Sequence, residues 1–119
     1  MVLIVEDEPV IREVLAAVLV DDGYRVRTAA NGREALDVLE AVDGTVPNLI
    51  VSDVAMPRMS GLELVERLRA RGDATPVVLM SASYAGVDEP GVRFLSKPFD
   101  LDDLTAAVRH ALGDRVPSR

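Results

Sequence analysis

Short apolar runs alternate along this chain with longer stretches in which apolar residues recur at helical spacing. A short, nearly continuous apolar run is typical of a strand covered on both faces, whereas alternation of apolar and charged residues is typical of a half-exposed strand. The alternating segment YRVRTA is expected at an edge of the sheet. The predicted strands are Val2 to Val5, Tyr24 to Ala29, Asn48 to Ser52, Pro76 to Met80 and Val92 to Leu95.

The first helix is predicted from Val10 to Val20, with Pro9 in its first turn and Gly23 ending it. Apolar pairs recur in it every four residues, which favours a broad buried stripe. The members of that stripe are Val10 and Ile11, Val14 and Leu15, Val18 and Leu19.

Three more helices are predicted from their first residues, which are Asn31, Ser60 with Glu63, and Asp100. Each is followed by apolar positions at helical spacing, which should face inward. These positions are Ala35, Leu36, Val38, Leu39 and Val42 in the first, Leu62, Val65 and Leu68 in the second, and Leu101, Leu104, Val108 and Leu112 in the last.

Strands that alternate with helices predict an α/β fold with a doubly wound parallel sheet. At 119 residues the chain is long enough for one core and too short for two. We therefore expect a single domain over residues 1–115 and a short tail at 116–119.

The connection between the last two strands departs from regular alternation. Only residues 81–91 are available for it, and a parallel crossover ordinarily takes a dozen or more. The segment Tyr84 to Gly91 contains two glycines and a proline, which disfavour a helix. The fourth helix of the alternation is therefore expected to be shortened or absent.

Composition and charge exclude several classes of function. The formal charge of -7 disfavours direct nucleic-acid binding, which needs clustered basic residues. The absence of cysteine excludes disulfides and thiolate metal sites. The longest apolar run, Val14 to Val20, is far below the ~20 residues that span a bilayer. A cytoplasmic protein without membrane contact is expected.

Charged residues follow the predicted strands, at the edge where open α/β sheets place their sites. Glu6 and Asp7 follow the first strand, Asp53 follows the third, and Lys97 follows the last. Two carboxylates ~5 Å apart repel by about 3 kcal/mol at an effective dielectric constant of 20. With Lys97 protonated, the cluster carries a charge of -3 + 1 = -2, which one Mg²⁺ would neutralise.

A carboxylate in such a cluster can act as a nucleophile toward a phosphoryl group. Asp53 has the position for this role, while Ser81 and Lys97 offer a hydroxyl and an ammonium to phosphoryl oxygens. Taken singly, Asp53 could be a turn residue and Ser81 a helix cap. The combination predicts a metal-dependent phosphoryl acceptor.

With these residues in place, nearly the whole chain resembles a response-regulator receiver domain of two-component signalling. The resemblance is carried by VEDE at residues 5–8, SDVAMP at 52–57, Gly61, Ser81-Ala82 and KPF at 97–99. It implies a flavodoxin-like fold with strand order 2-1-3-4-5.

The same resemblance implies the roles of the site residues. Asp53 would be the phosphoacceptor, and Glu6, Asp7, Asp53 and the backbone carbonyl of Ala55 would serve Mg²⁺. Ser81 and Phe94 would be the switch residues, with Lys97 binding the phosphoryl group. The implied partner is a histidine kinase or histidine phosphotransfer protein, and phosphorylation could drive a dimer, although the reduced fourth helix would leave it less surface. Such a domain assists its own phosphotransfer and autodephosphorylation without being an independent enzyme.

Other functions remain as alternatives. A receiver-like docking module would not be phosphorylated at all. An aspartyl-nucleophile phosphohydrolase of the haloacid dehalogenase type wants a second carboxylate two residues after the nucleophile, where this chain has Ala55. A flavin carrier wants a phosphate-cradling loop after the first strand, where the acidic residues 6–8 would repel phosphate.

Overall fold

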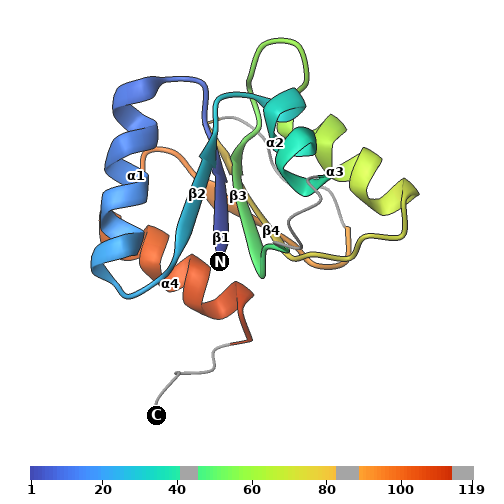
Figure 1. Cartoon of the computed structure of the whole chain (residues 1–119). Helices are drawn as coiled ribbons and strands as arrows, with labels where there is room; N and C mark the ends of the chain where they lie inside the picture. The colour runs from blue at the N-terminus through green and yellow to red at the C-terminus, as the bar shows by residue number, and fades with distance from the viewer. Residues whose placement is uncertain (41–45, 83–88, 114–119) are drawn as a thin grey trace.

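The computed structural model describes residues 1–40, 46–82 and 89–113, and it shows a parallel sheet with helices on both faces (Figure 1). The strand order is β2-β1-β3-β4-β5, as the resemblance implied. The elements are β1 (Val2–Val5), α1 (Pro9–Asp21), β2 (Val26–Ala29), α2 (Gly32–Leu39), β3 (Leu49–Asp53), α3 (Gly61–Ala70), β4 (Val77–Ser81), β5 (Val92–Ser96) and α4 (Leu101–Ala111). From β1 the chain first adds β2 on one side and then β3, β4 and β5 on the other. The order therefore switches between β1 and β3, and a crevice is expected at the carboxyl ends of these two strands.

Two apolar clusters form the core, one on each face of the sheet. Successive strand residues point to opposite faces, so Leu3 and Val5 lie in one cluster while Val2 and Ile4 lie in the other. Helices α2 and α3 cover the first face, and α1 and α4 cover the second (Figure 1). All residues of β1 and β3 are buried, which explains why these strands are almost continuously apolar.

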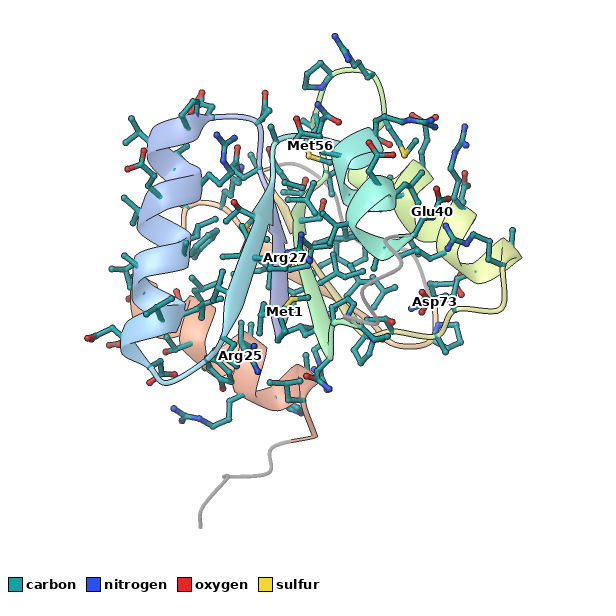
Figure 2. All side chains as sticks on the ribbon, in the orientation of Figure 1. Met1, Arg25, Arg27, Glu40, Met56 and Asp73 are labelled. Atoms are coloured by element: carbon teal, nitrogen blue, oxygen red, sulfur yellow. The ribbon has the colours of Figure 1, made fainter. Side chains whose placement is uncertain are left out.

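The strand predicted as an edge strand is indeed at the edge of the sheet. β2 pairs only with β1 and is largely half-buried. Figure 2 labels Arg25 and Arg27, which belong to this outer segment. The regular strand begins at Val26, two residues later than predicted, although the carbonyl of Arg25 already accepts a hydrogen bond from the Val2 N–H at 2.8 Å.

The predicted helix starts are confirmed by their hydrogen bonds. The Asn31 side chain accepts a hydrogen bond from the Glu34 backbone N–H at 2.9 Å. Ser60 and Glu63 form a reciprocal capping box at the start of α3. Asp100 and Asp103 form a second capping box at the start of α4. These caps satisfy backbone N–H groups that the first helical turn leaves without partners.

The broad buried stripe predicted for α1 was wrong. Only Leu15 and Leu19 are buried, whereas Val10, Ile11 and Val14 are 74%, 38% and 45% exposed. Neighbouring helical residues point about 100° apart, so the two members of a pair cannot both face the sheet. In addition, α1 is about 20 Å long and β1 only about 13 Å, so the first turn of α1 extends past the strand.

A second inward prediction, at Leu101, was also wrong. Leu101 is 46% exposed, whereas Leu104 and Val108 are fully buried. Leu101 is the first residue of α4, and the helix makes its core contacts from the next turn onward.

The expected loss of a helix between β4 and β5 agrees with the described residues. Ala82 and residues 89–91 are not helical, and the described part of the chain has four helices. Residues 84–88 of that prediction lie outside the described residues, as do Val42 and the predicted tail at 116–119. None of the described helices is both long and apolar enough to cross a bilayer.

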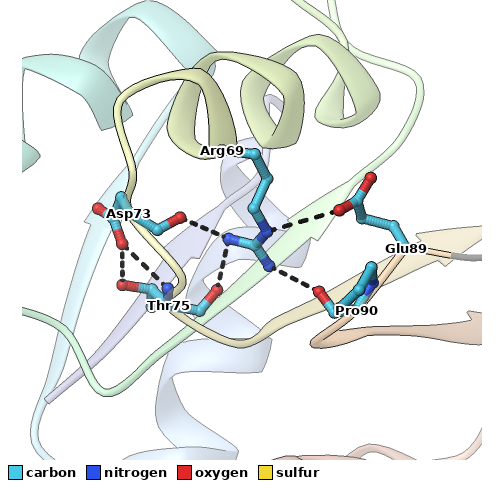
Figure 3. Close-up of polar contacts among 5 residues, drawn as sticks. All are labelled: Arg69, Asp73, Thr75, Glu89 and Pro90. Carbon is cyan, nitrogen blue, oxygen red and sulfur yellow. Dashed lines mark hydrogen bonds and ion pairs between the residues drawn. The ribbon is translucent and has the colours of Figure 1, made fainter.

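Arg69 connects the loop before β4 with the loop before β5 (Figure 3). Its guanidinium donates hydrogen bonds to the carbonyls of Asp73, Thr75 and Pro90 at 2.8, 3.1 and 3.2 Å. It also lies 4.0 Å from a carboxylate oxygen of Glu89. We call these five residues the Arg69 clasp. The clasp fixes the start of β4 against the start of β5.

Within the clasp, Asp73 accepts hydrogen bonds from the Thr75 hydroxyl and backbone N–H at 2.6 and 2.9 Å. Partial burial acts to raise the pKa of Asp73, but the Thr75 hydrogen bonds, together with Arg69 and Arg71, outweigh it and lower that pKa. Asp73 is therefore held as a carboxylate in the loop.

We predict that Arg69→Ala lowers the free energy of unfolding by about 2 kcal/mol, because it removes three charge-assisted hydrogen bonds from carbonyls in two loops. Urea unfolding measures this loss. Arg67→Ala is the matched control, since Arg67 is an exposed arginine on the same helix. Equal stability of the two variants would contradict the role given to the clasp.

Candidate functional site

The pairing of the strands brings the acidic residues to one level of the sheet. Val5 of β1 lies opposite Ser52 of β3, so Glu6 and Asp53 follow at the same height on neighbouring strands. Asp53 in turn lies opposite Met80 of β4. The predicted convergence at the carboxyl edge is therefore present.

Three carboxylates meet in this crevice. Glu6, Asp7 and Asp53 each offer one carboxylate oxygen, and these three oxygens lie within 4.8 Å of one another. Glu6 and Asp53 are buried, with 1% and 7% of their surface exposed, and Asp7 is half-buried. Such oxygen ligands are those that Mg²⁺ prefers.

Glu6 carries the largest electrostatic cost. One of its oxygens, Oε2, accepts a hydrogen bond from the Glu8 backbone N–H at 3.2 Å, while Oε1 is buried and has no hydrogen-bond partner among the described residues. Burial, with smaller contributions from Asp53 and Asp7, raises the pKa of Glu6 to about 7, against the lowering effects of the Glu8 hydrogen bond and Lys97. A buried carboxylate oxygen without a partner fits a cation as its missing neighbour.

Lys97 reaches the cluster from the end of β5. Its Nζ lies 2.8 Å from Oδ1 of Asp53, and its backbone N–H donates to the carbonyl of Ser81 at 2.8 Å. Ser81 and Ser96 are paired residues of β4 and β5, so Lys97 follows directly after the sheet ends. The Lys97–Pro98 peptide bond is cis. The structure thus joins the predicted lysine to the predicted nucleophile.

The other predicted residues lie on β4, on β5 and in the loop after β3. Ser81 lies at the carboxyl end of β4 and is half-buried. Phe94 lies in β5, opposite Leu79 of β4, and is also half-buried. Ala55 is exposed in the loop two residues after Asp53, and the role of its carbonyl stays a prediction.

Gly61, the first residue of α3, sits against the backbone of Asp53. A Cβ atom built on Gly61 would overlap the carbonyl oxygen of Asp53. The Gly61 backbone N–H donates to the carbonyl of Val54 at 2.9 Å, and the Ser52 hydroxyl donates to the carbonyl of Asp53, also at 2.9 Å. The backbone that carries Asp53 is therefore held from both sides.

Sequence reasoning missed Arg12, which contacts the acidic turn. Its Nη1 donates to the backbone carbonyl of Glu6 at 2.8 Å. A signal was available, because Arg12 precedes the buried Leu15 and Leu19 by three and seven residues and so shares their side of α1.

A cavity of about 440 Å³ opens beside the carboxylates. Glu6 and Lys97 are its polar lining residues, and the others are apolar. The apolar lining residues are Ile11, Met80, Ala82, Pro98 and Phe99. The centre is therefore reachable from the side of α1.

Known proteins resemble the chain in sequence and in structure. The family model for the response regulator receiver domain matches residues 2–109. The response regulator MprA of Mycolicibacterium vanbaalenii is 38% identical over 98% of this chain and 52% of its own length. The transcriptional regulatory protein TcrA of Mycobacterium tuberculosis is 40% identical over 98% of this chain and 47% of its own length.

Solved structures agree with these matches. The receiver domain of the hybrid histidine kinase CckA superposes with a TM-score of 0.79 at 40% identity, covering 93% of this chain and 97% of that one. The chemotaxis response regulator CheY4 of Vibrio cholerae gives a TM-score of 0.81 at 31% identity, covering 92% and 96%. The fold and the site define a phosphoacceptor class of signalling domain, and the chain belongs to the response regulator receiver domain family. It spans about half the length of the curated relatives named above.

Proposed function

We propose that this chain accepts a phosphoryl group on Asp53 from the phosphohistidine of a histidine kinase or phosphotransfer protein, in a reaction that needs Mg²⁺. The observation that carries this proposal is the placement of Asp53. Its carboxylate shares one crevice with those of Glu6 and Asp7, and the ammonium of Lys97 lies 2.8 Å from it. The two acids favour a cation there, and the ammonium favours an incoming anion.

The residues of the crevice fit Mg²⁺. Carboxylate oxygens of Glu6, Asp7 and Asp53 would hold the ion, together with the backbone carbonyl of Ala55. The buried Oε1 of Glu6, which has no hydrogen-bond partner in the described part of the chain, supports this assignment. A bound Mg²⁺ would offset the negative charge that otherwise keeps a phosphoryl group away from three carboxylates.

In the proposed transfer, a carboxylate oxygen of Asp53 forms a bond to phosphorus while the bond from phosphorus to the histidine nitrogen breaks. The nitrogen keeps the electron pair of that bond and takes up a proton. Lys97 then holds a phosphoryl oxygen by its ammonium, and Ser81 is placed to donate its hydroxyl to another. Later attack by water on the acyl phosphate would release inorganic phosphate and restore Asp53.

The alternatives fit the crevice less well. A docking module would not need a buried carboxylate cluster, which is costly without a cation. A phosphohydrolase of the haloacid dehalogenase type would need a second acid at position 55, which is alanine. A receiver that is phosphorylated and switches conformation accounts for all of the charged groups present.

The test is incubation with a small phosphodonor, with and without Mg²⁺, followed by intact-mass measurement and peptide mapping. A gain of one phosphoryl group on Asp53 that requires Mg²⁺ is expected. Full occupancy by phosphate without a divalent cation, or no phosphorylation under any condition, would overturn the proposal.

The surface next to the crevice supports a protein partner that carries the phosphohistidine. The first turns of α1 expose Val10, Ile11 and Val14, and Ile11 also lines the cavity that leads to Lys97. An exposed apolar patch of this kind beside a reactive centre is typical of a protein interaction site. We assign it to the phosphodonor protein.

We predict that Val14→Asp slows phosphotransfer from a histidine kinase at least about tenfold, because a charge replaces an apolar contact in the interface. Phosphorylation by a small phosphodonor should be unchanged. Val20→Asp makes the same change at the far end of α1, where the side chain is 57% exposed, and it should leave both rates intact. A Val14→Asp variant that accepts phosphate from the kinase at the wild-type rate would contradict the assignment.

A further inference from the structure

Arg12 contacts the backbone of the acidic turn after β1, and the proposed transfer does not use it. It lies in the first turn of α1, is half-buried, and donates from Nη1 to the carbonyl oxygen of Glu6 at 2.8 Å. A hydrogen bond from a charged guanidinium to a carbonyl is stronger than one between neutral groups. The contact therefore restrains the turn between β1 and α1.

The restrained carbonyl belongs to the peptide group that joins the two acidic residues. The carbonyl of Glu6 and the N–H of Asp7 lie in one rigid plane, so holding the oxygen also sets the direction in which the chain leaves toward Asp7. On the other side, the backbone N–H of Glu6 donates to the carbonyl of Ala29 at 3.1 Å. Glu6 is thus held by β2 through its N–H and by α1 through its carbonyl.

We propose that Arg12 is a positioning residue for the metal site: it fixes the peptide plane between Glu6 and Asp7 and so sets the relative placement of their carboxylates. The inference rests on the proposed function, because it concerns the site that would hold Mg²⁺. A positioning residue of this kind would touch neither the ion nor the phosphoryl group. Its effect passes through the backbone.

This role differs from a general contribution of positive charge. Arg109 carries the same charge and is exposed in the last turn of α4. That end of the helix lies opposite the carboxyl ends of the strands, away from the carboxylates. If charge alone mattered, removing either arginine would make the chain more acidic and would strengthen cation binding. If position matters, only Arg12 should act.

The experiment compares Arg12→Ala, Arg12→Lys and Arg109→Ala in the full chain by Mg²⁺ titration. Arg12→Ala should weaken Mg²⁺ binding about tenfold, as is usual when a residue that orients metal ligands is removed. Arg12→Lys retains a charged donor on a long side chain and should recover most of the affinity. Arg109→Ala should bind Mg²⁺ as the wild-type chain does.

A metal-free measurement keeps the inference separate from folding and from phosphorylation. The amide resonance of Asp7 reports on the hydrogen bond made by the preceding carbonyl. It should shift in Arg12→Ala without Mg²⁺ and stay in place in Arg109→Ala. Wild-type affinity in Arg12→Ala would overturn the positioning role, and so would an equal loss in Arg109→Ala. Failure of the wild-type chain to bind Mg²⁺ would instead overturn the proposed function.

Discussion

Replacing Asp53 by asparagine should abolish acceptance of the phosphoryl group. The amide lacks the carboxylate oxygen that attacks phosphorus, so no acyl phosphate can form at position 53. The fold should survive the change, because asparagine has nearly the same shape and its carbonyl oxygen can still accept the hydrogen bond that Lys97 gives to Asp53 at 2.8 Å. Intact-mass measurement after treatment with a small phosphodonor and Mg²⁺ gives the result directly.

The matched control for this change is Asp37→Asn, since Asp37 is an exposed aspartate on α2. That variant should be phosphorylated to the wild-type extent. Phosphorylation of the Asp53→Asn variant to the same extent at another residue would contradict the assignment of Asp53.

The second large effect concerns stability, pH and Mg²⁺. In the native state the pKa of Glu6 is about 7, against an ordinary value of 4.5. Between these two values the native chain holds a proton on Glu6 that the unfolded chain has released, so the free energy of unfolding should fall as pH rises from 4.5 to 7. The full loss is about 3 kcal/mol.

Mg²⁺ should offset this loss. The cation binds the ionised carboxylates of the native state, so saturating Mg²⁺ should raise the melting temperature at neutral pH and do little below pH 4.5, where Glu6 is protonated. Thermal melts across this pH range, with and without Mg²⁺, measure both effects. A melt at neutral pH that is unchanged by saturating Mg²⁺ would speak against a cation site.

Two variants separate the causes. Glu6→Gln removes the titrating group and should flatten the dependence of stability on pH between 4.5 and 7. Asp7→Asn removes one repelling charge, so it should stabilise the metal-free chain while weakening Mg²⁺ binding. If Asp7→Asn instead destabilised the metal-free chain, repulsion among the carboxylates would not be the dominant cost.

The sequence was sufficient for the parts of the molecule that depend on local patterns. Continuous apolar runs marked the buried strands, and short polar side chains marked the starts of α2, α3 and α4. The site followed from the same logic, because residues that directly follow parallel strands must meet at one edge. Glu6, Asp53 and Lys97 were found in this way.

Features that depend on tertiary geometry were not predictable from these patterns. The exposure of Val10 and Val14 depends on the length of α1 relative to β1, which hydrophobic spacing does not describe. The spacing of Arg12 from Leu15 and Leu19 shows which side of α1 it shares, but its contact with the Glu6 carbonyl depends on the angle at which the chain enters α1. Arg69 contacts Pro90, 21 residues further along the chain, and only the folded sheet brings the two together.

The Arg69 clasp has a consequence for how the domain can vary in length. Because Arg69 holds Pro90 and contacts Glu89, and the Val77 N–H donates to the carbonyl of Gly91 at 2.9 Å, the alignment of β5 with β4 is set immediately before β5 begins. The number of residues between Ser81 and Glu89 does not enter that alignment. Insertions there would leave Ser96 opposite Ser81 and Lys97 beside Asp53, so the reactive centre is insulated from added length in the connection.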